Sequence, residues 1–201
     1  MASTPQDFGT ARMLGIAGSA LVLLGILVPL ASIVGFILVL VSLYMLSKML
    51  GEESIFRNAV ISVALSIAGF LAFIFITGAS LFTLATGRAF EPGEIEALSA
   101  AGIGGLILGF IVFYVLLVAS AVFFRRALDT LAEKSGVDMF RYAGLAYLIG
   151  SITLIIIIGG LVLLVSWVLL LVGFIQLKAQ EGGVESPTAP MQSPGVATGR
   201  I

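Results

Sequence analysis

The stretch NAVISVALSIAGFLAFIFITGASLFTLATG, residues 58–87, decides the fold because it contains no Asp, Glu, Lys or Arg. A transmembrane helix crosses the ~30 Å hydrocarbon core in about 20 residues. This stretch is therefore one membrane crossing, somewhat long or tilted. Three further stretches are free of these charged residues, and they cover 13–47, 97–124 and 142–177.

The composition also indicates a membrane protein. Of the 201 residues, 60% are hydrophobic and only 10% are charged, whereas soluble domains carry about 25% charged residues. The few charges cannot cover the exterior of a soluble domain of this length. We predict an integral membrane protein whose solvent is the lipid bilayer. Its net charge of −1 lacks the basic excess that nucleic-acid binding requires.

The two outer charge-free stretches are too long for one crossing, because each would form a helix of over ~50 Å. The first contains Pro29, which disfavours helix, and the second contains Gly159 and Gly160, where a turn costs least. We predict an all-α polytopic transmembrane helical bundle over residues 12–178. A segment 1–11 precedes it and a disordered tail 179–201 follows it. The six predicted spans are 13–28, 32–47, 58–84, 98–124, 142–158 and 161–177.

Four helices, of which the outer two are long and kinked, are the alternative, and the basic residues distinguish the two models. Six spans place nine Lys and Arg residues on one face and only Arg88 on the other, whereas four spans divide them six against four. The positive-inside bias favours six spans, with both termini on the cytoplasmic side of the membrane. The predicted topology anchors at the cytoplasmic helix ends are Arg12, Lys48, Arg57, Arg125, Arg126, Arg141 and Lys178.

Two similar segments, ESIFRNAV at 53–60 and VDMFRYAG at 137–144, stand where the chain enters the membrane from this side. In each, an acidic residue precedes Phe-Arg-x-Ala. The acid suits the positive start of a helix, and the Arg side chain can reach the headgroups. The similarity indicates either convergent topology anchors or an internal repeat that relates spans two and three to spans four and five.

Catalytic chemistry has little support in the sequence. The absence of Cys and His excludes disulfides, thiolate chemistry and nearly all zinc sites. The predicted spans hold no ionisable residue, which argues against proton-coupled transport and voltage sensing. Serines in the spans are interpreted as groups that hydrogen-bond across helices or to their own backbone; they are Ser19, Ser42, Ser62, Ser66, Ser120, Ser151 and Ser166. We expect no enzymatic activity, no cofactor and no metal site.

Small residues four positions apart predict close helix packing, either within the chain or across a homo-oligomer. These packing residues are Gly15, Ser19, Gly105, Gly109, Ala146 and Gly150. A second group consists of polar and aromatic residues that lie deep in the spans and need partners for their polar atoms. These are candidates to line a cavity: Tyr114, Tyr147, Ser151 and Trp167.

Two functions fit these observations. The first is a non-enzymatic accessory or scaffold subunit, which associates with itself or with a larger membrane complex. The alternative is a small transporter or channel for an uncharged or lipid-like solute.

A family resemblance agrees with the prediction of a multi-pass membrane protein. The segments that carry it are the Gly-rich opening hairpin at 12–48, then GEESIFRNAVIS at 51–62, and the closing segment at 131–174. Over roughly residues 10–177 the chain resembles an archaeal family of uncharacterised multi-pass membrane proteins, domain of unknown function 996. The resemblance implies an archaeal plasma-membrane location, and it supplies no activity and no catalytic residues.

Overall fold

The computed structural model describes residues 5–25, 28–86, 92–156 and 158–177. Within these residues the fold is all-α, with six α-helices and one short 3-10 turn. The elements are α1 (Pro5–Leu24), α2 (Pro29–Met49), α3 (Glu53–Thr86), α4 (Pro92–Ser135), α5 (Met139–Ile152), η2 (Thr153–Ile155) and α6 (Ile158–Gln176). Four of these helices, α2, α3, α4 and α6, are long and apolar enough to cross a membrane.

Both outer charge-free stretches fold back as helical hairpins, α1–α2 and α5–α6. Pro29 is the first residue of α2, where its fixed φ suits a helix and its missing N–H costs nothing. The loops before α3 and α5 each contain a glycine in the left-handed region, Gly51 at φ 65° and Gly136 at φ 68°. Only glycine adopts this conformation without strain, so the two similar loops also turn in the same way.

The turn between α5 and α6 lies earlier than the glycine pair predicted. The helix ends through η2, and Ile156 is extended, whereas Gly159 is already in the first turn of α6. A side chain on Gly159 would collide with the backbone of Thr153 and Leu154. This glycine therefore permits close approach of the two helices, while other residues make the turn.

Helix α4 continues well past residue 124, where the charge-free stretch ends. Its last part reaches Ser135 and buries Ala127, Leu128 and Leu131. These apolar positions recur at helical spacing on one face. Burial against the other helices therefore explains why the helix extends into charged sequence.

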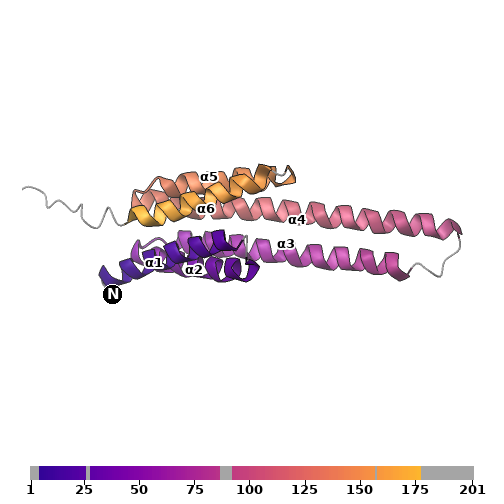
Figure 1. Cartoon of the computed structure of the whole chain (residues 1–201), viewed down its shortest axis with the longest axis horizontal. Coiled ribbons are helices and arrows are strands. Elements are labelled where there is room, and N and C mark those ends of the chain that lie inside the picture. The colour runs from indigo at the N-terminus through magenta and orange to yellow at the C-terminus, as the bar shows by residue number, and fades with distance from the viewer. Residues whose placement is uncertain (1–4, 26–27, 87–91, 157, 178–201) are drawn as a thin grey trace, which may run out of the picture.

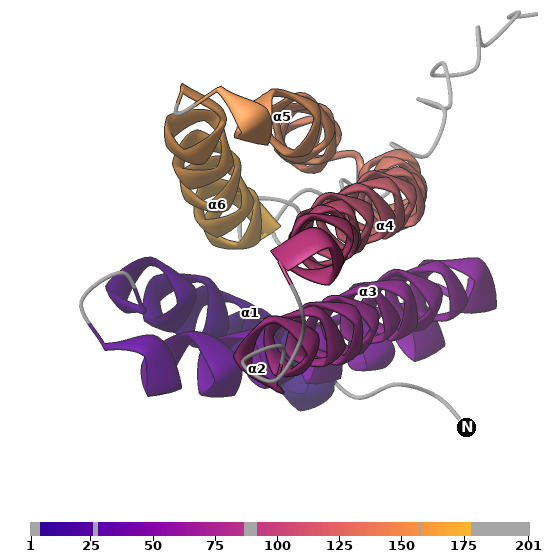
Figure 2. The same ribbon diagram turned by 90° about the vertical axis from the view of Figure 1, so that its right-hand side faces the viewer.

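The helices form two layers of three. Helices α1, α2 and α3 make one layer, and α4, α5 and α6 make the other (Figures 1 and 2). The most extensive contact is between α3 and α4, and the layers also meet where α1 packs on α6. Figure 1 shows that the α3–α4 hairpin extends far beyond the two short hairpins.

The core lies at the end where all six helices meet. Its largest fully buried side chains include Leu43, Leu46, Ile55, Leu128, Phe140 and Phe174. The other end differs, because there α3 and α4 pack on each other and expose large apolar residues. We call this part, residues 71–86 and 92–112, the far arm. Phe75 is 79% exposed there and Phe82 is 70% exposed.

Helix α1 begins at Pro5, ahead of the predicted first span. The predicted disordered tail, 179–201, lies outside the described residues, as does Lys178.

Candidate functional site

The predicted topology anchors that the structure describes gather at one end of the bundle, which we call the basic end. They are Arg12, Lys48, Arg57, Arg125, Arg126 and Arg141. These residues lie toward the starts of α1, α3 and α5 and toward the ends of α2 and α4, which meet at one end of the bundle in Figure 1. Contacts between neighbouring helices fix the helices against each other at the basic end. The rings of Tyr44 and Phe56 are 4.9 Å apart, between α2 and α3, and Gly144 of α5 lies against Arg125 of α4.

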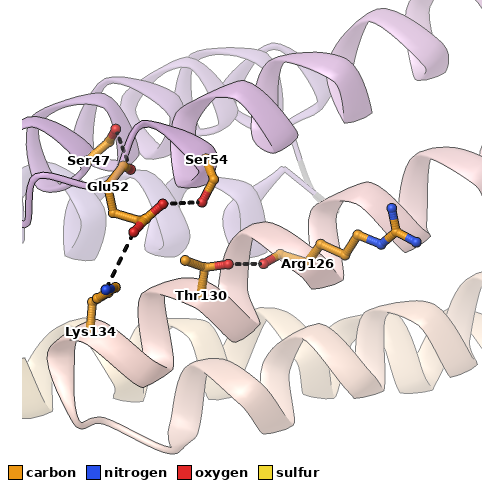
Figure 3. Close-up of polar contacts among 6 residues, drawn as sticks. All are labelled: Ser47, Glu52, Ser54, Arg126, Thr130 and Lys134. Carbon is orange, nitrogen blue, oxygen red and sulfur yellow. Dashed lines mark hydrogen bonds and ion pairs between the residues drawn. The ribbon is translucent and has the colours of Figure 1, made fainter.

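A polar cluster at the basic end joins the α2–α3 loop to the end of α4 (Figure 3). The Nζ of Lys134 lies 3.5 Å from Oε2 of Glu52. Ser54 donates a hydrogen bond to the other carboxylate oxygen at 2.8 Å, and Ser47 donates to the Glu52 carbonyl at 2.9 Å. The Ser54 hydroxyl and the Lys134 ammonium lower the pKa of the Glu52 carboxyl. Thr130, in the same view, donates to the Arg126 carbonyl within α4.

The serines of the apolar segments are hydrogen-bonded to backbone carbonyls or to each other. Ser42 donates to the Ala11 carbonyl of α1 at 2.7 Å, and Ser166 donates to the Ala143 carbonyl of α5 at 2.8 Å. Ser120 of α4 makes hydrogen bonds with the hydroxyls of Ser62 and Ser66 on α3, and it also donates to the Ser62 carbonyl. These contacts bind helices together and supply no general base, which a nucleophilic serine needs.

The predicted packing glycines lie against other helices of the same chain. Gly15 faces the ring of Phe174 on α6, Gly105 faces Ser80 on α3, and Gly150 faces Leu163 on α6. Gly109 faces Ile76 on α3. Ser19 donates to the Gly15 carbonyl within α1, and Ala146 is half-buried on α5.

Gly18 and Gly35 form a direct contact between α1 and α2, and the spacing of small residues did not predict this pairing. A side chain on Gly18 would lie 2.7 Å from the Gly35 carbonyl oxygen, and one on Gly35 would lie 2.6 Å from that of Gly18. The backbones of α1 and α2 therefore touch directly. The glycines Gly15 and Gly18, three residues apart on α1, were the available signal, but pairing of Gly18 with Gly35 requires knowledge of the register.

Two of the four candidate cavity residues, Tyr147 and Trp167, come together in an aromatic cluster, and Ser151 lies beside it, one turn from Tyr147 on α5. The rings of Tyr147 and Trp167 are 6.3 Å apart and nearly perpendicular, and Ser151 donates to the Tyr147 carbonyl. The ring centre of Phe124, which sequence reasoning missed, lies 4.9 Å from that of Tyr147. Tyr114 lies apart and donates to the Ile152 carbonyl at the end of α5. A solute path through these residues stays a prediction.

Among the described residues there is no group of three or more Asp and Glu side chains that could hold a metal ion. Glu91 and the side chains of Glu94 and Glu96 lie outside the part of the chain that the structure describes.

Comparison with known proteins gives a family and one relative. Residues 31–168 match the family described as Protein of unknown function (DUF996). The chain is 31% identical over 175 residues to Uncharacterized protein MJ1644 of Methanocaldococcus jannaschii, which covers 86% of this chain and 94% of that protein. No solved structure matches. The family match runs from α2 into α6, so it includes both similar loops.

Proposed function

We propose a role for a chain that belongs to the DUF996 family of proteins of unknown function: a non-enzymatic scaffold or accessory subunit of the plasma membrane. The observation that carries this proposal is the far arm, an apolar two-helix surface that extends beyond the rest of the bundle.

The proposal includes six membrane crossings with both termini on the cytoplasmic side. The basic end supports this orientation, because Lys and Arg gather on cytoplasmic loops and helix ends. The lengths of α2 and α6, 20 and 19 residues in their apolar parts, are close to the ~30 Å of the hydrocarbon core.

The turns of the two short hairpins favour a position among the outer headgroups. Val28 in one turn and Ile156 in the other are exposed apolar residues just outside the helices. Their own N–H groups donate to the carbonyls of Leu24 and Thr153, but a turn between two helices leaves other terminal N–H and C=O groups without a partner in the helix, and hydrocarbon supplies none. A turn at the outer interface obtains partners from water.

Six crossings have a consequence for the far arm. The apolar part of α2 spans 20 residues or ~30 Å, while from Arg57 to Thr86 α3 rises about 29 residues or ~44 Å. A core of ~30 Å that matches α2 is shorter than α3, because a tilt of about 40° still leaves α3 ~33 Å long across the membrane. The far arm then stands partly outside the hydrocarbon. Exposed apolar surface of this kind indicates a protein interface.

Photo-crosslinking in native membranes tests the scaffold role. A photoreactive amino acid replaces Phe75 of α3 or Ile107 of α4 on the far arm, and Val165 of α6 as the matched control, which is 54% exposed. We expect defined protein adducts from the two far-arm positions and lipid adducts alone from the control.

Lipid adducts at all three positions, together with a monomer after purification, would contradict the scaffold proposal. Solute flux through liposomes that contain this monomer would then support the transporter alternative.

A further inference from the structure

A groove runs along the surface between α2 and α3. Helix α3 packs far more extensively on α4 than on α2, so its side toward α2 stays open. Three hollows follow one another there. A hollow of about 440 Å³ at the basic end shares Tyr44, Phe56 and Val60 with a second of about 340 Å³. The second shares Ile37 and Leu40 with a third of about 490 Å³. Because neighbouring hollows share these residues, we infer that the three form one groove along α2 and α3.

The end of this groove at the basic end is positively charged. Lys48 and Arg57 line the first hollow together with Glu53, which leaves one net positive charge. Both ion pairs found among the described side chains involve other residues, namely Arg125 with Asp129 and Lys134 with Glu52. The Nζ of Lys48 lies 5.8 Å from the centre of the Tyr44 ring, which places this ammonium beside the opening of the apolar part.

The rest of the groove is apolar. The second hollow is lined by side chains such as Ile37, Val41 and Val60, and the third extends to Ile33 and Ile67. From Lys48 to Ile33 the groove follows about 15 residues of α2, or ~22 Å. This length corresponds to the headgroup and chain region of one leaflet, which is half of a ~40–45 Å bilayer.

We propose that the α2–α3 groove binds a membrane lipid with an anionic phosphate headgroup. The phosphate lies between Lys48 and Arg57, and a hydrocarbon chain follows the apolar groove toward Ile33. Charge complementarity selects the headgroup, since basic side chains at the membrane surface attract anionic lipid. A chain in the groove covers apolar side chains that α2 and α3 leave open.

This site is independent of the scaffold role and of the far arm. It requires that the basic end lies at a headgroup layer, and it does not depend on which side of the membrane that layer faces. The crosslinking experiment above can fail without affecting it.

Native mass spectrometry of the full chain, purified and stripped of lipid, tests the proposal. The probes are phosphatidylglycerol and phosphatidylcholine with identical chains, so that only the headgroup charge differs. We expect the wild type to retain one phosphatidylglycerol in preference to phosphatidylcholine by roughly tenfold. The double variant Lys48→Gln with Arg57→Gln is expected to lose this preference to within about twofold.

Two controls identify the groove as the site. Arg126→Gln with Arg141→Gln removes two exposed cations from the same end on other helices, and it should keep the preference. Val60→Trp fills the groove without changing charge and should weaken retention of both lipids, whereas Val115→Trp on α4 should not. The single native Trp167 in the aromatic cluster reports by its fluorescence that each variant without an added tryptophan is folded.

Three results would overturn the proposal. One is equal retention of the two lipids by the wild type, and another is loss of the preference in the Arg126 and Arg141 variant. The third is full displacement of phosphatidylglycerol by millimolar inorganic phosphate, which would show a site for the free anion.

Discussion

Gly18 and Gly35 show how single residues hold this bundle together. Between helices in lipid there is little hydrophobic driving force, so close backbone contact and hydrogen bonds between helices supply the association energy. The backbone contact between α1 and α2 at these glycines is one case, and the Ser62, Ser66 and Ser120 group between α3 and α4 is another. Large side chains in these places would separate the helices.

We expect Gly15→Ala to destabilise the protein. The added methyl group would overlap the ring of Phe174, which is fully buried and cannot move aside. Overpacking of this kind costs about 1–3 kcal/mol, or roughly 2–10 °C in thermal midpoint for a chain of this size. The measurement is thermal unfolding in detergent, followed by the fluorescence of Trp167.

Gly9→Ala on the same helix is the matched control. A side chain there has no atom within 4 Å, and alanine favours helix by up to ~1 kcal/mol over glycine. Its midpoint should stay equal or rise, and equal midpoints for both variants would contradict the packing role of Gly15.

Ser120→Ala should weaken the contact between α3 and α4. It removes the hydroxyl that links Ser62 and Ser66, and hydrogen bonds between membrane helices contribute about 0.6 kcal/mol on average and at most ~1.7. Thr130→Ala is the control, because it loses only a hydrogen bond to Arg126 within its own exposed turn. If both variants melt at the same temperature, the serine group does not stabilise the pair.

At the scale of the helices, charge-free length predicts most of the elements. It correctly requires both outer stretches to fold back, and Pro29 marks the start of α2. The length of the charge-free stretches fails to predict the end of α4, because the charge-free stretch stops before Arg125. The apolar face of the helix continues through Ala127, Leu128 and Leu131. The helical periodicity of those three residues was the available signal.

The candidate site was predictable only in part. Depth in the spans selects Tyr147, Ser151 and Trp167, which the fold brings together. It does not select Phe36 or Phe124, which complete the aromatic cluster, because the sequence of an all-round apolar helix does not show which face meets a neighbour. The α2–α3 groove could not be predicted for the same reason, since it depends on how the two helices diverge.

The cluster around Glu52 predicts a pH dependence at the basic end. Its carboxyl pKa is lowered by Ser54 and Lys134, so the ionised form is preferred in the folded state. The resulting stability is present above the ordinary pKa of glutamate and is lost as the pH falls through the lower, folded value. Glu52→Gln should therefore lower the thermal midpoint at pH 7 by about 1–3 °C.

The difference between wild type and Glu52→Gln should shrink as the solution is acidified below the ordinary glutamate pKa. Glu133→Gln removes the same charge from an exposed position on α4 and serves as the control. A difference that is constant with pH would show that the carboxylate charge does not stabilise the α2–α3 loop.

At the scale of the whole molecule, the two short hairpins and the far arm have different lengths from the same basic end (Figure 1). Either length alone fits the thickness of a membrane. Together they require that either the short hairpins or the far arm end away from a membrane interface. Six crossings place the far arm partly outside the hydrocarbon. Short hairpins that turn inside the bilayer would instead place the far arm in lipid, where it needs no protein partner.

Cysteine labelling determines which arrangement is present, and the chain has no native Cys. With a membrane-impermeant maleimide on sealed cells, we expect Val28→Cys and Gly93→Cys to react from outside. Asp138→Cys, in the loop before α5, should react only in inverted vesicles, because the proposed six crossings place that loop on the cytoplasmic side. A Val28→Cys protein that reacts from neither side, and only after detergent, would mean that the short hairpins turn within the bilayer. The far arm would then be covered by lipid, and the scaffold proposal would lose the observation that carries it.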